Sequence, residues 1–198
     1  VKELAEKTGF KPEVIDIGGG FGIPYSIQDR IVNISEFGKK ITSVVQTMGI
    51  KKLILEPGRF IVGNTGVLLT KVLYVKKRGE KNFVIVDAGM NDLIRPALYS
   101  SHHTILPVKQ QTTSEHTVKA DIVGPICETA DYLGKDIEMP ENIKKGDLLI
   151  VASAGAYSFS MSSNYNSRLK PCELLIDGEK ISVIRAREKY SDLWKNQM

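Results

Sequence analysis

Cysteine is scarce in this sequence, which contains only Cys127 and Cys172 among its 198 residues. Two cysteines without paired spacing form neither a disulfide framework nor a metal-ligand pattern, so we expect free thiols in a reducing compartment, the cytoplasm. Long hydrophobic runs are also missing, because no stretch approaches the roughly 18 consecutive apolar residues of a membrane-spanning helix. The first residues carry no apolar signal segment, and we expect no membrane association.

Charge of one sign does not dominate either. The chain has 27 basic and 23 acidic residues, a formal net charge of +4, and 42% hydrophobic residues. Its short basic patches at 76–78 and 144–145 are separated by acidic or apolar residues, which is typical of solvated faces rather than of a nucleic-acid surface. The composition therefore predicts a globular protein without a nucleic-acid partner.

An initiator methionine is absent. The chain starts at Val1, in what reads as the end of a helix that stops at Gly9, so we expect a piece of a longer protein. A strand at 13–17, a helix capped by Ser35 and a strand at 52–55 follow, and this βαβ pattern predicts parallel strands. About two such units are far fewer than a (β/α)8 barrel of roughly 250 residues contains, so most of any barrel would precede Val1.

After Gly66 the pattern changes to strands separated by turns. Strands are expected at 67–75, 82–87, 104–109, 117–123, 147–152, 173–176 and 181–185, and helical stretches at 96–100, 156–165 and 188–194. The predicted fold class is α/β followed by all-β. Residues 1–65 would be the C-terminal portion of a (β/α)8 barrel, and residues 66–198 a β-sandwich or barrel-like domain whose last helix packs back on the barrel.

Three consecutive glycines, Gly18, Gly19 and Gly20, follow the first predicted strand. Glycines let backbone N–H groups approach a ligand without a Cβ in the way, which suits a phosphate dianion. Their spacing does not match the dinucleotide-binding pattern, and no Lys-Ser/Thr pair for a nucleoside triphosphate follows. A tight structural turn is an equally good interpretation of this motif alone.

The next predicted strand ends in Glu56-Pro57-Gly58-Arg59, where an α/β barrel collects its functional residues. Glu56 and Arg59 bring opposite charges to one rim, and Gly58 permits close approach of the backbone. A rim salt bridge before a helix is the alternative. Two consecutive strand ends with phosphate-compatible glycines favour a binding site.

Further motifs follow these two in order. They are Val86–Asp92, Arg95–Tyr99, Gly124–Glu128 and Gly155–Tyr157. From about residue 14 to 194 the sequence closely resembles the barrel-type pyridoxal-phosphate-dependent amino-acid decarboxylases. The resemblance implies pyridoxal 5'-phosphate as the cofactor and decarboxylation of an amino acid as the reaction.

The resemblance also implies where the cofactor binds. Backbone groups of the three glycines, with Gly58 and Arg59, would hold its phosphate. Glu56 would face the pyridine nitrogen, since a carboxylate favours the protonated ring, which is the better electron sink. Tyr157 would reach cofactor and substrate, unless it is a packed core tyrosine. The family anchors the cofactor on a lysine near the start of the barrel, and no lysine here follows that motif, so we expect these residues alone to be inactive.

A substrate carboxylate is the implied ligand of Arg95 and Tyr99, together with Arg59. Proline is favoured at the first helical position, so a helix beginning at Pro96 would place Arg95 at its cap, one turn from Tyr99. A surface arginine and a core tyrosine are the alternative.

Cys127 and Glu128 follow a strand and a Gly-Pro pair, which predicts a turn or loop. A lone cysteine is usually a buried, inert thiol. The resemblance instead implies that this thiol, kept protonated, returns a proton to the α-carbon after carbon dioxide leaves, and that Glu128 recognises the distant amino group of the substrate. In the family this loop enters the site of the partner subunit, which implies a homodimer with shared active sites.

The substrate remains open among several. Glu128, with two arginines and a tyrosine for a second carboxylate, favours meso-2,6-diaminopimelate, which would give L-lysine in the last step of lysine biosynthesis. Ornithine, arginine or a carboxylated polyamine are alternatives, as is a non-catalytic relative that binds the cofactor or a protein partner. His102 and His103 lack a third ligand, so we expect two solvated histidines and no metal site.

Overall fold

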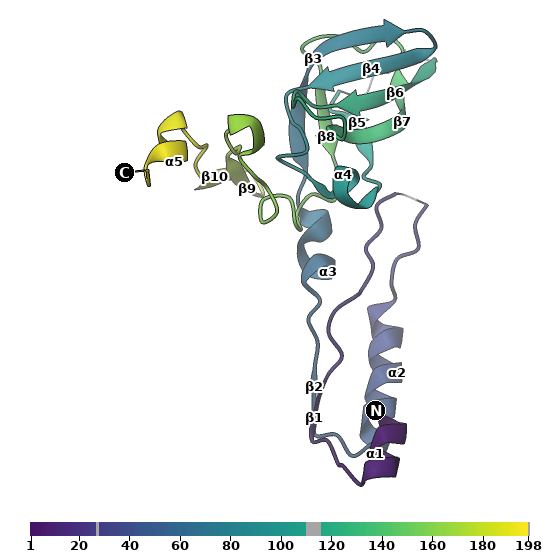
Figure 1. Ribbon diagram of the computed structural model, residues 1–198. Coiled ribbons are helices and arrows are strands. Elements are labelled where there is room, and N and C mark those ends of the chain that lie inside the picture. The colour runs from purple at the N-terminus through teal and green to yellow at the C-terminus, as the bar shows by residue number, and fades with distance from the viewer. Residues whose placement is uncertain (27, 110–115, 198) are drawn as a thin grey trace.

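The computed structural model describes residues 1–26, 28–109 and 116–197. Figure 1 shows a curled sheet at one end, a segment of helices and short strands at the other, and a two-stranded ribbon that projects sideways. The first segment contains α1 (Lys2–Thr8), β1 (Val14–Asp16), α2 (Ile34–Thr47), β2 (Lys52–Ile54), α3 (Gly58–Val62) and the 3-10 helix η1 (Gly63–Thr65). β1 and β2 pair in parallel, which confirms the predicted βαβ arrangement.

The helix α2 begins earlier than predicted. Asn33 is its N-cap, and the side chain of Asn33 accepts a hydrogen bond from the backbone N–H of Glu36 at 3.1 Å. Ser35 lies inside the helix, so the prediction that Ser35 is the N-cap is wrong. Asparagine and serine are about equally good N-caps, so the residue type alone could not decide between them.

A six-stranded sheet forms the larger unit, in the order β5-β8-β3-β4-β6-β7. Its strands are β3 (Leu68–Arg78), β4 (Lys81–Val86), β5 (Ile105–Pro107), β6 (Thr117–Val123), β7 (Tyr132–Pro140) and β8 (Leu148–Val151). β4 and β6 are parallel, and the other neighbouring pairs are antiparallel. Because the outer strands β5 and β7 also contact each other, the sheet curls into a nearly closed barrel, which confirms the predicted barrel-like domain.

One apolar cluster fills the inside of this sheet. Its most deeply buried members, each at most 1% exposed, are Val72, Val84, Val86, Leu93, Ile122, Leu133, Met139, Leu149 and Val151. Burial of each such side chain stabilises the fold by about 1.5–3 kcal/mol. The cluster thereby fixes the ends of β4 and β6, from which the loops at 87–92 and 124–131 leave the sheet.

In this unit the sequence does not predict one of the strands, and two local predictions are wrong. β7 has no counterpart among the predicted strands, because glycine and charged residues interrupt its alternation. Residues 155–161 form turns rather than the predicted helix at 156–165, and only the 3-10 helix η2 (Tyr165–Ser167) follows. In α4 (Arg95–Tyr99) the N-cap is Ile94, so Arg95 is the first helical residue and not the cap.

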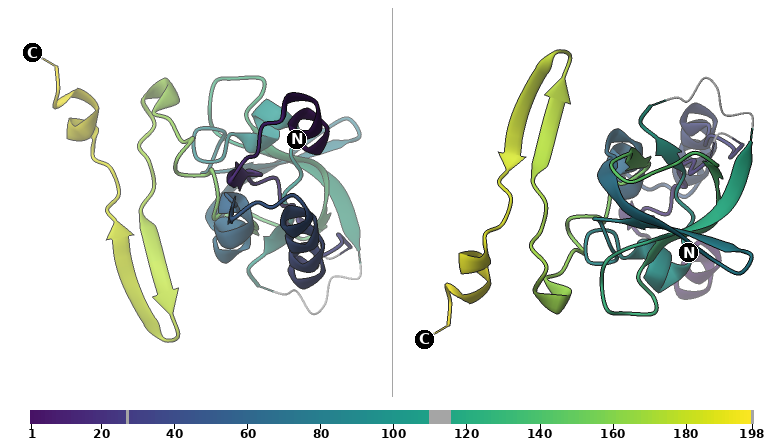
Figure 2. Two further views of the ribbon diagram at one scale, coloured as in Figure 1. Left: turned by 90° about the horizontal axis from the view of Figure 1, so that it is seen from below. Right: turned by 90° about the horizontal axis from the view of Figure 1, so that it is seen from above.

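The chain ends in an antiparallel ribbon of β9 (Glu173–Asp177) and β10 (Lys180–Arg185), followed by α5 (Tyr190–Trp194). Figure 2 shows this ribbon and α5 standing away from the sheet and from α1 and α2. Packing of the last helix on a barrel therefore stays a prediction. Within the described ranges, no helix is long and apolar enough to cross a membrane.

Candidate active site

The two glycine-bearing strand ends lie against each other. The backbone N–H of Glu56 donates to the carbonyl oxygen of Gly18 at 2.8 Å. The α-carbon of Gly19 faces the carbonyl of Glu56 so closely that a Cβ atom would stand 2.3 Å from the oxygen. Gly19 is thus required for the packing of the two turns. The same contact holds both turns side by side at the carboxyl ends of β1 and β2.

Some backbone donors of these turns are already engaged. The N–H of Gly18 donates to Oδ1 of Asp16 at 2.8 Å, and the N–H of Gly58 to the carbonyl oxygen of Glu56 at 2.9 Å. Gly19 and Gly20 are different, since their N–H groups have no hydrogen-bond partner among the residues that the structure describes. These two groups are therefore the glycine donors available to an anion.

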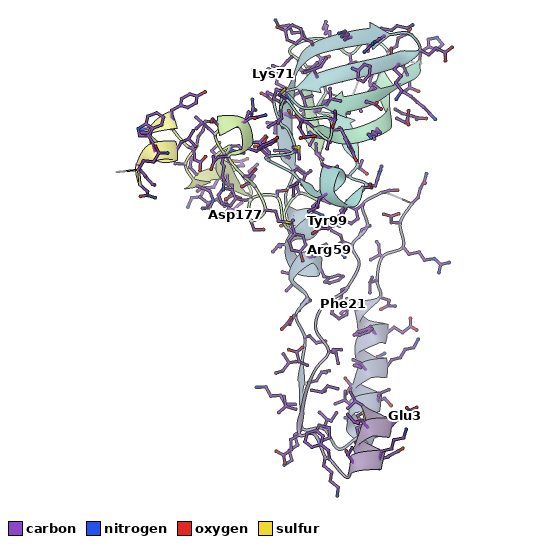
Figure 3. All side chains as sticks on the ribbon, viewed as in Figure 1. Glu3, Phe21, Arg59, Lys71, Tyr99 and Asp177 are labelled. Carbon is purple, nitrogen blue, oxygen red and sulfur yellow. The ribbon has the colours of Figure 1, made fainter. Side chains whose placement is uncertain are left out.

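A cavity of about 370 Å³ lies beside the two turns. It is lined by Gly20, Phe21, Glu56, Gly58, Arg59, Arg95, Tyr99, Tyr157 and Met161. In Figure 3, Arg59 and Tyr99 lie near each other where the helical segment meets the sheet, and Phe21 lies farther along that segment. Most of the predicted site residues thus gather in one hollow, although they come from distant parts of the chain.

Arg95 is held between two aromatic rings. Its guanidinium carbon lies 5.5 Å from the ring centroid of Tyr99 and 5.2 Å from that of Tyr157. The rings stabilise the cation through their negative faces. The Nε atom of Arg95 is buried and has no hydrogen-bond partner among the described residues. A buried donor of this kind marks a place for an anionic acceptor, such as a carboxylate or a phosphate.

Tyr157 has a backbone conformation that is rare for its residue type. Its φ is 67°, in the left-handed region, and its side chain is 43% exposed. A non-glycine residue in this region carries backbone strain, and such residues cluster at functional sites. The exposure and the position on the cavity wall disfavour the alternative of a packed core tyrosine.

Tyr25, which no sequence motif singles out, connects the two arginines. Its hydroxyl oxygen lies 3.4 Å from Nη1 of Arg59 and 3.5 Å from Nη2 of Arg95, and it accepts from both. One arginine belongs to α3 and the other to α4. Tyr25 follows the glycine-rich turn at a short distance, but a tyrosine after Ile-Pro in a loop carries no signal that would single it out.

His103 is buried, at 1% exposure, whereas His102 is exposed. Nδ1 of His103 lies 2.9 Å from the carbonyl oxygen of Ala152, so Nδ1 is the protonated donor. Burial lowers the pKa of His103, and the charge of Arg95 acts in the same direction. The prediction of two solvated histidines is therefore wrong for His103. Among the described residues, no group of three or more His, Cys, Asp or Glu side chains could hold a metal ion.

Cys127 and Glu128 do not line the cavity of this chain. Both are exposed on the loop at 124–131. The carboxylate of Glu128 accepts from the N–H of Ala130 at 3.3 Å and from the hydroxyl of Thr129 at 3.0 Å, and these bonds hold the pKa of Glu128 below its usual range. The loop thus presents a thiol and a carboxylate on the surface, and the predicted roles of both residues stay predictions.

Comparison with known proteins gives consistent matches. Residues 14–155 match the family model described as the C-terminal sheet domain of pyridoxal-dependent decarboxylase. The diaminopimelate decarboxylase of Aquifex aeolicus (strain VF5) is 46% identical over 188 residues, which make up 95% of this chain and 44% of the relative. The chain therefore spans about half the length of the curated relatives it matches.

Solved structures agree with this match. A crystal structure of a protein from Aquifex aeolicus superposes with a TM-score of 0.90 at 43% identity, covering 100% of this chain and 48% of that one. Diaminopimelate decarboxylase from Helicobacter pylori, complexed with L-lysine, gives a TM-score of 0.86 at 39% identity, covering 99% of this chain and 47% of that one.

Proposed function

This chain belongs to the pyridoxal-dependent decarboxylase family, and from that premise we propose that the complete protein is a diaminopimelate decarboxylase. It converts meso-2,6-diaminopimelate into L-lysine and carbon dioxide, the last step of lysine biosynthesis. The observation that carries the proposal is that Glu56, Arg59 and Arg95 all line one cavity. The relative from Aquifex aeolicus carries this name, and the Helicobacter pylori enzyme binds L-lysine, the product of the reaction.

The residues of the cavity, together with Gly18 and Gly19 in the turn beside it, fit pyridoxal 5'-phosphate. The free N–H groups of Gly19 and Gly20 and the guanidinium of Arg59 suit its phosphate, while Gly18 and Gly58 shape the turns. The carboxylate of Glu56 suits its protonated ring nitrogen. When bound, the cofactor supplies an electron sink for the negative charge that develops as carbon dioxide leaves. We place the lysine that anchors it in the half of the protein that lies outside these residues.

Substrate orientation falls to the two arginines. Arg95, fixed by its contacts with Tyr99 and Tyr157, binds a substrate carboxylate with Arg59. Guanidinium groups pair with carboxylates through parallel hydrogen bonds, which fix orientation as well as position.

Cys127 and Glu128 act in the site of a second subunit. Their exposure on the loop at 124–131 leaves them accessible to another copy of the protein, and we therefore propose a homodimer with shared active sites. The thiol of Cys127 would give its proton to the α-carbon from which carbon dioxide has left, and would itself become a thiolate. The ionised carboxylate of Glu128 binds the distant ammonium group of the substrate.

The domain layout completes the proposal. Residues 1–65 form the last part of the cofactor-binding barrel and residues 66–198 the β domain. Large apolar side chains are exposed in the first segment, such as Leu4, Val14 and Val44 at 60%, 52% and 53%, which is consistent with packing against further barrel elements. We place the enzyme in the cytoplasm, where its two thiols stay reduced.

A substrate panel on the full-length protein tests this function. Carbon dioxide release is measured with meso-2,6-diaminopimelate, L-ornithine, L-arginine and carboxynorspermidine at saturating pyridoxal 5'-phosphate. We expect kcat/KM for diaminopimelate to exceed the others by about a hundredfold or more, since a site built for polar groups rejects analogues that lack them. The variant Glu128→Gln should reduce this preference. Faster turnover of ornithine or arginine would reassign the substrate, and no release from any of them would refute the proposal.

A further inference from the structure

The loop that carries Cys127 is closed by a buried carboxylate. Asp131 is 5% exposed. Its Oδ2 atom accepts a hydrogen bond from the N–H of Ile126 at 2.6 Å, and its Oδ1 atom accepts one from the N–H of Met90 at 2.7 Å. Asp131 therefore bonds to the residue directly before Cys127 and, at the same time, to the loop that follows β4.

The main chain of Asp131 also takes part. Its carbonyl oxygen accepts from the N–H of Gly124 at 3.0 Å, and its N–H donates to the carbonyl oxygen of Glu128 at 3.1 Å. Asp131, the last residue of the loop at 124–131, is thus bonded to the beginning and to the middle of that loop. The hydrogen bonds that hold the Cys127 segment in place therefore converge on Asp131.

Two glycines leave space for this carboxylate. A Cβ atom on Gly124 would stand 2.4 Å from Oδ2 of Asp131, and one on Gly89 would stand 2.8 Å from Oδ1. Neither glycine has a positive φ, so space and not backbone conformation requires glycine at both positions. Gly89, in the motif Val86–Asp92, and Gly124, in the motif Gly124–Glu128, therefore leave the space that the Asp131 side chain occupies.

Electrostatics agree with this arrangement. Burial raises the pKa of Asp131, while the hydrogen bonds from Met90 and Ile126 and the charge of Arg168 act against the rise. Burial of a carboxylate is costly unless hydrogen bonds satisfy it. Here the donors that satisfy it are backbone groups of the thiol-bearing loop and its neighbour.

We propose that Asp131 is a positioning residue of the decarboxylase, which acts through Cys127 by fixing the backbone at Ile126. The inference rests on the proposed function, in which Cys127 returns a proton to the α-carbon. A proton donor must lie within hydrogen-bond reach of its target, and a displacement of about 1 Å can slow a reaction by roughly a hundredfold. The hydrogen bond from Ile126 to Asp131 fixes the backbone directly before Cys127, and thereby the position from which the thiol projects.

A double-mutant cycle in the full-length holoenzyme tests the role. Asp131→Asn keeps the shape but replaces one acceptor by an NH2 group, which cannot accept from a backbone N–H. We expect kcat to fall about tenfold to a hundredfold with unchanged affinity for pyridoxal 5'-phosphate. In the Cys127→Ala background the same change should lower kcat by less than about twofold, because the residue it positions is gone.

The control is Asp121→Asn, since Oδ1 of Asp121, in β6, also accepts a backbone N–H, that of Asp136 in β7 at 2.9 Å, outside the loop at 124–131. Its kcat should stay within about twofold of the wild type. The positioning role is wrong if Asp131→Asn lowers kcat by the same factor in the wild-type and the Cys127→Ala backgrounds. It is also wrong if Asp131→Asn leaves kcat unchanged in the wild-type background. Unchanged turnover in Cys127→Ala alone overturns the proposed function of Cys127 instead.

A measurement on the wild type covers the case in which Asp131→Asn does not fold. Hydrogen exchange should show the amides of Ile126 and Met90 protected to the same degree as those of β6, because both are bonded to a buried acceptor. Rapid exchange of these two amides would refute the proposal.

Discussion

Gly19 approaches Glu56 so closely that a methyl group on its α-carbon would stand 2.3 Å from the backbone carbonyl oxygen of Glu56. Gly22, in the same segment, has nothing within 4 Å of the equivalent position. The two glycines therefore form a matched pair, in which only one holds the turns together.

This contact predicts opposite results for two alanine variants. Gly19→Ala should lower the free energy of unfolding by about 1–3 kcal/mol, because the extra methyl group pushes the turns apart. It should also weaken the binding of pyridoxal 5'-phosphate. Gly22→Ala should change the free energy of unfolding by less than about 0.5 kcal/mol. Urea unfolding and cofactor titration of the full-length protein measure both effects, and equal losses in the two variants would contradict the account.

Tyr25→Phe removes the hydroxyl that accepts from Arg59 and Arg95. Because a hydrogen bond contributes about 0.5–1.5 kcal/mol, we expect KM for the substrate to rise about twofold to tenfold. The rate constant kcat should change less. Tyr74→Phe is the control, since Tyr74 is 61% exposed on β3, away from the cavity. Steady-state kinetics decide, and an unchanged KM in Tyr25→Phe would exclude Tyr25 from substrate binding.

Cys127→Ala should slow turnover and leave cofactor binding almost intact, because the thiol gives a proton to the α-carbon of the substrate after carbon dioxide has left and does not hold the cofactor. Proton transfer by a positioned side chain contributes about a hundredfold to ten-thousandfold to a rate. Cys172→Ala, the change at the other free thiol, should have no effect on kcat. Single-turnover kinetics and the absorption of the bound cofactor separate the two quantities. Wild-type turnover in Cys127→Ala would remove this residue from the proton-donor role.

His103 makes the fold sensitive to acid. Above a pH of about 6.5 a histidine is neutral in the unfolded chain, and burial keeps His103 neutral in the folded chain as well. Below that pH the unfolded chain binds a proton that the folded chain does not, so stability falls as the pH falls. The slope is at most about 1.4 kcal/mol per pH unit for one proton.

Urea unfolding at a series of pH values measures this slope. His103→Gln should lose the part of the slope that His103 contributes, whereas His102→Gln should keep it, because His102 is exposed. Buried Asp92 and Asp131, whose pKa values are raised by burial, contribute stability of the opposite pH dependence. The comparison is therefore made between variants, and equal slopes in both would contradict a buried neutral His103.

Much of the fold could be predicted from local sequence signals. The turn at Gly9 and strand β6 were predicted where they occur, because a glycine after a helix and an apolar run between turns each have one simple interpretation. Strand β7 was not predicted. Gly134, Lys135 and Asp136 interrupt its pattern, and only pairing with β6 reveals it.

The candidate site divides in the same way. Arg59 and Arg95 could be singled out, since each stands in a recognisable motif, and the structure brings both to one cavity. Tyr25 and Asp131 could not, because a tyrosine in a loop and an aspartate after a turn are common. Their importance lies in contacts across 34 to 70 residues for Tyr25 and 41 residues for Asp131. Only the folded chain makes such long-range contacts visible.

A crystal structure of the full-length protein with pyridoxal 5'-phosphate tests the central claim most directly. The cofactor phosphate should lie within hydrogen-bond distance of the N–H groups of Gly19 and Gly20 and of the guanidinium of Arg59, with its ring nitrogen facing Glu56. A cofactor bound elsewhere, or a phosphate that touches neither turn, would contradict it.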